Sequence, residues 1–70
     1  MKLKNPLKFR QMYAEELKSL TIQEISNKSN VSVRTVWKVL RGEPMRPQTA
    51  RKLATPLGVE ATEIAIFTAQ

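Results

Sequence analysis

The apolar residues of this chain recur mostly at three- and four-residue spacing, which is the period of an α-helix rather than of a strand. The first such series is Phe9, Tyr13, Leu17 and Leu20, with Leu7 and Met12 beside it. Asn5 before Pro6 is a typical helix opening, because asparagine caps the first turn and proline suits its first position. The pattern predicts a first helix that ends near residue 18.

A second helix begins with an unusually complete start signal. Thr21 and Glu24 have the spacing of a capping box, in which each side chain accepts a hydrogen bond from the backbone N–H of the other residue. Leu20 and Ile25 have the spacing of a hydrophobic staple across that cap. We expect this helix to run to about Ser29.

A tight turn and a third helix follow directly. Asn30 tolerates the left-handed backbone that such a turn needs, and Ser32 is a good N-cap. Val36 and Val39 are expected to face the core. Three cationic residues of the same helix recur at four- and three-residue spacing and form one basic stripe on the opposite side: Arg34, Lys38 and Arg41. Gly42 is expected to end the helix.

The rest of the chain predicts two more helices. Pro47 opens the fourth, Gly58 stops it, and Pro56 is expected to distort its last turn. A short fifth helix is expected over residues 61–67. Residues 1–4 have no periodic partner and are expected to form a frayed arm, and residues 68–70 a tail. The expectation is therefore a single all-α domain over residues 1–70, with five helices and no strand.

The distribution of charge along the chain also bears on function. Residues 1–58 hold 12 basic and 4 acidic side chains, whereas residues 59–70 hold two acidic side chains and no basic one. A basic body of this kind attracts a polyanion through counterion release. The chain has no cysteine and no histidine, so we expect no metal, no cofactor and no enzymatic activity. No apolar run is long enough to span a bilayer, so we expect no membrane partner and a cytoplasmic, nucleoid-associated protein.

The order of these features resembles the Cro and phage-repressor family of helix-turn-helix proteins, over residues 7–67. The residues that carry the resemblance are Leu20-Thr21, Ile25-Ser26, Asn30-Val31-Ser32, Thr35-Val36, Val39, Arg41-Gly42, Arg46-Pro47, Leu53-Ala54 and Leu57-Gly58-Val59. The segment RGEPMRPQTARKLATPLGV is the more specific part. The resemblance implies a compact five-helix, lambda-repressor-like domain whose helix-turn-helix spans residues 21–42.

The resemblance also implies roles for individual residues. The start of the third helix would read bases in the major groove through Val33, Arg34 and Lys38, because arginine and lysine favour guanine and valine can pack on a thymine methyl group. Positions that hold DNA phosphates in the family are Thr21, Thr35, Arg41, Arg46, Gln48 and Thr49. Trp37 has two interpretations: a lid on the loop around Met45, or a contact to DNA in the groove.

The chain departs from the family at Trp37, whose position is usually polar, and at three further points. Ile22 stands where a glutamine is common, and Asn30 where a glycine is usual. Glu15 and Leu40 stand where many members have an arginine and a glutamate that form a buried ion pair. The loss of that pair need not cost stability, because an apolar replacement can pack equally well.

The functional expectation is a sequence-specific regulator of transcription, a repressor, that binds double-stranded DNA. The family binds near-palindromic operators as a dimer, with Ile64, Ile66 and Phe67 as the candidate dimer surface. Closure of the core is the alternative role for Ile64 and Phe67. No small-molecule ligand is expected. An alternative from another class is a protein-interaction module, such as an antitoxin or bridging factor, that docks a partner on the apolar fifth helix.

Overall fold

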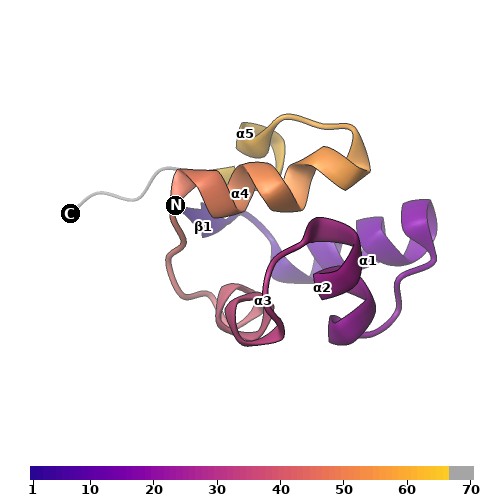
Figure 1. The fold of residues 1–70 in the computed structure, drawn as a ribbon. Coiled ribbons are helices and arrows are strands. Elements are labelled where there is room, and N and C mark those ends of the chain that lie inside the picture. Colours follow the sequence, from indigo (N-terminus) through magenta and orange to yellow (C-terminus); the bar gives the residue numbers. More distant parts are fainter. Residues whose placement is uncertain (67–70) are drawn as a thin grey trace.

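The structure is a computed structural model that describes residues 1–66. It is a compact, mostly helical domain with a small two-stranded sheet (Figure 1). The elements, in chain order, are β1 (Lys2–Leu3), α1 (Pro6–Leu17), α2 (Ile22–Ser29), α3 (Val33–Leu40), α4 (Pro47–Ala54), the 3₁₀ turn η1 (Thr55–Leu57), α5 (Ala61–Ile64) and β2 (Ala65–Ile66). The five predicted helices and the mostly helical class are confirmed, and only the expectation of no strand is wrong, because β1 and β2 form a small sheet.

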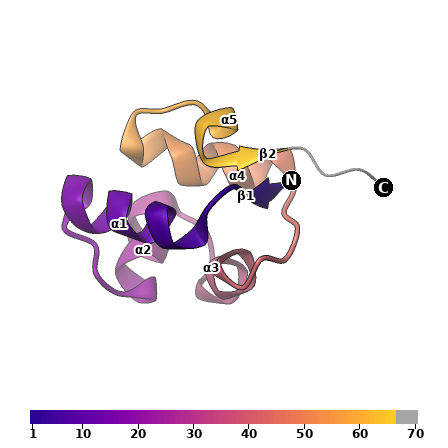
Figure 2. The same ribbon diagram turned by 180° about the vertical axis from the view of Figure 1, so that it is seen from behind.

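The sheet joins the two ends of the described chain. β1 and β2 are antiparallel, with Leu3 opposite Ala65, and they lie side by side in Figure 2. The first residue also pairs with the loop between α3 and α4: the Met1 amino group donates to the Met45 carbonyl oxygen at 2.8 Å, and the Met45 N–H donates back at 2.6 Å. Residues 1–4 are therefore not a frayed arm, because their backbone is bonded on both sides.

The same pairing shortens the fifth helix. The sequence predicted a helix over residues 61–67, but α5 ends at Ile64, and Ala65 has an extended backbone with φ of −141°. Ile64 and Ala65 are both buried. The backbone leaves the helix because β1 offers it strand pairing, and apolar spacing over four residues cannot reveal such a distant partner.

One core lies between the helices and the sheet. Its buried apolar residues are Met1, Leu3, Phe9, Tyr13, Ile25, Val31, Val36, Val39, Met45, Ala50, Leu53, Ala54, Ile64 and Ala65. Tyr13 is central, since its ring packs on Phe9 with centroids 5.0 Å apart and its hydroxyl donates to the Leu53 carbonyl oxygen at 2.6 Å. The core thus connects α1 to α4 both by packing and by a buried hydrogen bond.

The helix ends follow the sequence signals, with two exceptions. The capping box of Thr21 and Glu24 forms, and Pro56 lies in a 3₁₀ turn after α4, which Gly58 stops with φ of +69°. The predicted staple does not form, because Leu20 is largely exposed while Ile25 is buried. Lys18 ends α1 with a left-handed backbone, a conformation that the sequence did not predict at a lysine.

Candidate nucleic-acid interface

The helix pair α2–α3 is held together through its turn. Asn30 has the left-handed backbone expected of it, with φ of +60°. Ser26 makes a contribution that its small size did not predict: its hydroxyl donates to the Val31 carbonyl oxygen and so ties α2 to the turn. Val31 is buried just beyond it. The direction in which α3 leaves the turn is therefore fixed by both a backbone conformation and a side-chain hydrogen bond.

α3 is capped at its start and anchored on one side. The Ser32 hydroxyl accepts from the Thr35 N–H at 3.2 Å, which satisfies one of the free donors of the first turn. Val36 and Val39 are buried against the core. In Figure 1 the helix is seen almost along its axis at the bottom of the molecule, far from α5 at the top. Its outer side is thus presented to solvent by a rigid support.

The outer side of α3 carries a stripe of four exposed residues, here called the α3 stripe: Arg34, Trp37, Lys38 and Arg41. Their spacing of three, four and seven residues places them on one side of the helix. Arg41 lies near Glu43, with 4.0 Å between Nε and Oε2, and both side chains are well exposed. Such a long, solvated ion pair contributes little, so all three cations of the stripe remain accessible to an anionic partner.

Val33 stands at the first position of α3, next to the stripe, and is half-buried. Its neighbour Arg34 makes no hydrogen bond or ion pair with another described residue. The two side chains therefore stand together at the start of the helix, as the sequence predicted, with one small and apolar and the other long, charged and free to reach outward.

The two threonines predicted to hold phosphates differ in their hydrogen bonding. The Thr35 hydroxyl accepts from Ser32 at 2.9 Å, so its own proton points to no described acceptor. The Thr21 hydroxyl instead donates to Glu24 at 3.1 Å. That bond, together with the N–H donors of Thr21 and Leu20, lowers the pKa of Glu24. Because Thr21 is bonded to an anion, it is a poorer phosphate ligand than Thr35.

Three more of the predicted phosphate ligands lie at the start of α4. Arg46 is the N-cap and is exposed, Pro47 is the first helical residue, and Gln48 and Thr49 follow in the first turn. No side chain caps this helix, so its first-turn N–H groups are open to an external acceptor. The preceding loop is held by the Met1–Met45 pairing, which no pattern in the sequence predicts.

Trp37 lies in an environment that neither interpretation of the sequence predicted. It lines a groove formed with Pro6, Leu7 and Arg10 of α1, Ile22 of α2, and Leu40 and Arg41 of α3. The sequence could indicate the exposed position of Trp37 on α3 but not its neighbours from α1 and α2, which lie 15 or more positions away.

The candidate dimer residues differ in their exposure to solvent. Ile64 is buried in the core, which corresponds to the core-closing alternative. Ile66 on β2 is about half exposed. Phe67 lies outside the described residues. Of the dimer candidates that the structure describes, Ile66 alone presents an apolar side chain to solvent.

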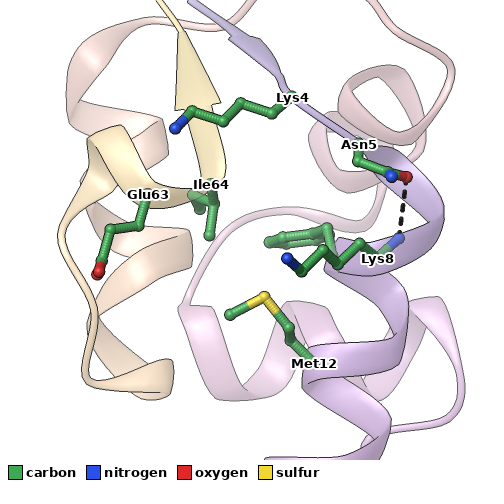
Figure 3. A pocket seen from close by; sticks show the side chains of 7 residues that line it. Lys4, Asn5, Lys8, Met12, Glu63 and Ile64 are labelled. Carbon is green, nitrogen blue, oxygen red and sulfur yellow. Dashed lines mark hydrogen bonds between the residues drawn. The ribbon is translucent and has the colours of Figure 1, made fainter.

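A second hollow lies between α1 and α5 (Figure 3) and has a volume of about 300 Å³. Its floor is apolar, formed by Phe9, Met12 and Ile64, and Lys4 and Lys8 stand over it. The Asn5 carboxamide oxygen accepts from the Lys8 N–H at 3.1 Å as the cap of α1 (Figure 3). Its polar groups are therefore surface lysines, the Glu63 carboxylate and a helix cap, which do not by themselves define a ligand site.

Residues 1–66 contain no group of three or more acidic, histidine or cysteine side chains that could hold a metal ion. Within the same residues, no helix has the length and apolar character required to cross a membrane. The chain matches no protein-family model, no curated protein and no solved structure. What can be said of its function therefore depends on the geometry of its own surface.

Proposed function

We propose that this chain is a sequence-specific regulator of transcription, a repressor, that binds double-stranded DNA by placing α3 in the major groove. The observation that carries the proposal is the α3 stripe: three accessible cations on one side of a short helix whose other side is fixed in the core. A helix of this kind fits the width of the major groove of B-form DNA. The helix pair would then be a helix-turn-helix of the lambda-repressor-like type that the sequence resembles.

Within this proposal the residues divide by role. Val33, Arg34 and Lys38 contact base edges, with Arg34 or Lys38 reading guanine and Val33 packing on a thymine methyl group. The Thr35 hydroxyl and the cations Arg41 and Arg46 contact phosphates, which sets register without reading sequence. Gln48 and Thr49 contribute further phosphate contacts from the first turn of α4, where the backbone N–H groups are not capped by a side chain. Thr21 is the weakest member, because its hydroxyl is already bonded to Glu24.

The proposal includes a homodimer on a near-palindromic operator. A single module of this size buries too little surface for tight specific binding, and two copies on adjacent half-sites remedy that. Ile66 is the described residue best placed to take part, since it is apolar and exposed. Repression would follow from occupancy of an operator that overlaps a promoter.

The alternative of a protein-interaction module at the fifth helix has weak support. Ile64, the apolar residue of α5 on which it depended, is buried, and Ile66 is the only exposed large apolar residue of the α5–β2 segment. Apolar exposure is instead concentrated around α1 and α3, at the groove that Trp37 lines.

The test is selection from a random double-stranded DNA library, followed by titration of the selected sequence at several salt concentrations. We expect enrichment of a near-palindrome that binds at least about 10³-fold more tightly than random DNA. Weak binding to every sequence, with affinity set by salt alone, would contradict the proposal. A selected site without symmetry, bound by one copy, would contradict the dimer while leaving α3 as the reader.

A further inference from the structure

Two of the exposed large apolar side chains of the described chain lie together. Four large hydrophobic residues are exposed: Leu7 (69%), Leu20 (68%), Trp37 (53%) and Ile66 (50%). Leu7 and Trp37 line the same groove. The Leu20 backbone lies beside Arg10, which also lines the groove, since the Arg10 guanidinium donates to the Leu20 carbonyl oxygen at 3.4 Å. Exposed hydrophobic residues that gather in one place mark interaction sites.

The groove, here called the apolar groove, is formed by three elements. The first turn of α1 supplies Leu7, the start of α2 supplies Ile22, and α3 supplies Trp37 and Leu40, with Arg10 and Arg41 at its edges. Figure 2 shows the first turn of α1, in indigo, next to α3. Its volume is about 410 Å³, which is enough for one or two large side chains of a partner.

Its composition is that of a protein interface. Tryptophan and arginine are the residue types most enriched where binding energy is concentrated, and apolar side chains surround them in the buried centre of an interface. Phosphate contacts, by contrast, come from cationic and polar side chains. A floor of leucine and isoleucine would gain nothing from lying against a sugar–phosphate backbone.

Charge decides between possible occupants. The residues that line the groove include two arginines and no acidic side chain. A second copy of the chain docked groove to groove would add two more arginines and no acidic side chain from its own lining, and like charges across an interface are unfavourable. A carboxylate beside each arginine would instead form charge-assisted, two-pronged hydrogen bonds.

We propose that the apolar groove docks a segment of another protein that presents an apolar or aromatic side chain flanked by carboxylates. The apolar side chain enters between Leu7 and Trp37, and the carboxylates bind Arg10 and Arg41. This surface is distinct from α5 and from the DNA-reading start of α3, although it shares Trp37 and Arg41 with the α3 stripe.

That overlap has a regulatory consequence, which rests on the proposed function. A segment that covers Trp37 and Arg41 removes part of the α3 stripe from DNA, so the protein partner and the operator compete for the chain. Displacement from DNA by an acidic protein would then relieve repression without any change in the fold.

The experiment is selection of a phage-displayed library of random twelve-residue peptides against the folded chain. Enriched peptides are synthesised and titrated through the fluorescence of Trp37, which is the only tryptophan. We expect enriched peptides to contain an apolar or aromatic residue with at least two neighbouring Asp or Glu residues, and their binding to change the Trp37 emission. Leu7→Gln and Arg10→Glu should each weaken binding by about tenfold or more.

The matched control is Ile66→Gln, which alters a similarly exposed apolar residue outside the groove. It should leave peptide affinity unchanged. The proposal is overturned by failure to enrich any peptide, by enriched peptides without acidic residues, or by binding that Leu7→Gln does not affect. It is also overturned if the free chain sediments as a dimer that Leu7→Gln dissociates, since the occupant would then be a second copy.

DNA binding separates this proposal from the one before it. Leu7→Gln should bind the selected DNA as the unaltered chain does; an equal loss of DNA and peptide affinity would assign the groove to the DNA surface and overturn the docking site. If the unaltered chain binds peptides as described but no DNA sequence, the docking site stands and the proposed function fails. Addition of the tightest peptide should release bound DNA, and simultaneous binding would refute the competition.

Discussion

At the scale of single residues, the proposed function assigns base contacts to cations near the start of α3 and phosphate contacts to cations farther from it. Arg34 is the second residue of that helix, whereas Arg46 occupies the N-cap position of α4, beyond the loop. Base contacts confer specificity and phosphate contacts confer affinity on any sequence. Replacement of each of these two arginines should therefore have a different effect on DNA binding, although both carry the same charge.

Arg34→Ala is expected to weaken binding to the selected operator by about 1–3 kcal/mol and to relax discrimination at one base pair. Arg46→Ala is expected to weaken binding to all sequences alike and to reduce the slope of log affinity against log salt by about one unit. The measurement is a titration of both variants on the operator and on single-base substitutions of it. Uniform losses for Arg34→Ala would reassign it to a phosphate, and an unchanged salt slope would remove Arg46 from the interface.

A second residue-scale prediction concerns the buried tyrosine. Burial raises the pKa of Tyr13 to about 12, with the Ser29 hydroxyl offsetting part of the effect. In the unfolded chain the phenol ionises near 10. Its contribution to stability is therefore fully present below pH 10 and is lost as pH rises from 10 through 12, by an amount on the order of 2–3 kcal/mol.

The check is direct because Tyr13 is the only tyrosine. Phenolate absorbance of the folded chain should titrate near 12, and near 10 in strong denaturant. Titration of the folded chain near 10 would show that the hydroxyl is accessible to water and that its bond to Leu53 does not persist. Tyr13→Phe should lose the absorbance change and, with the Leu53 acceptor left without its donor, should unfold more easily at neutral pH.

At the scale of the element, the start of α2 is set by a local motif. The Thr21 hydroxyl both accepts from the Glu24 N–H at 3.2 Å and donates to the Glu24 carboxylate at 3.1 Å. The carboxylate also accepts from the Thr21 N–H at 3.1 Å. These bonds lower the pKa of Glu24, so their contribution to stability is present above the ordinary glutamate pKa and is lost as pH falls.

Thr21→Ala is expected to cost about 0.5–2 kcal/mol of folding stability and to return the pKa of Glu24 toward its ordinary value. Thr21→Ser keeps the hydroxyl and should restore both. Urea unfolding and carboxyl titration by NMR measure the two effects on the same variants. A full loss of stability with no movement of the Glu24 pKa would mean that the two residues do not act as one cap.

Local signals of this kind explain which parts of the fold were predictable. The capping box, the left-handed Asn30 and the glycine stops depend on a few neighbouring residues, and the structure has them where the sequence placed them. The stripe of Arg34, Lys38 and Arg41 was likewise predictable, because helical period alone determines which residues share a side.

What the sequence could not reveal depends on partners far along the chain. Residues 1–4 show no helical periodicity because they include the short strand β1, and Ala65, the partner of Leu3, is more than 60 positions away. The same holds for Trp37, whose groove is completed by Leu7 and Ile22. A hydrophobic pattern within a dozen residues predicts which side of a helix or strand is apolar, but it does not predict which distant residues pack on that side.

At the scale of the whole molecule, the pairing of β1 with β2 makes the N-terminal segment part of the folded core. Leu3 is 7% exposed and belongs to the core, while its neighbour Lys2 is exposed on the same short strand. The backbone around them is bonded to β2 on one side and to the loop before α4 on the other. A loss of packing at Leu3 should therefore be felt as a loss of global stability.

Leu3→Ala is expected to destabilise the domain by about 2–5 kcal/mol, the cost of removing a buried leucine side chain. A domain of this length has little more stability than that to lose, so a large part of the variant should be unfolded at 37 °C. Lys2→Ala is the matched control, because it changes the adjacent exposed side chain, and it should have almost no effect. Helical circular dichroism during urea unfolding measures both. Equal stability of the two variants would mean that residues 1–4 are the frayed arm suggested by the sequence pattern, and that the core closes without them.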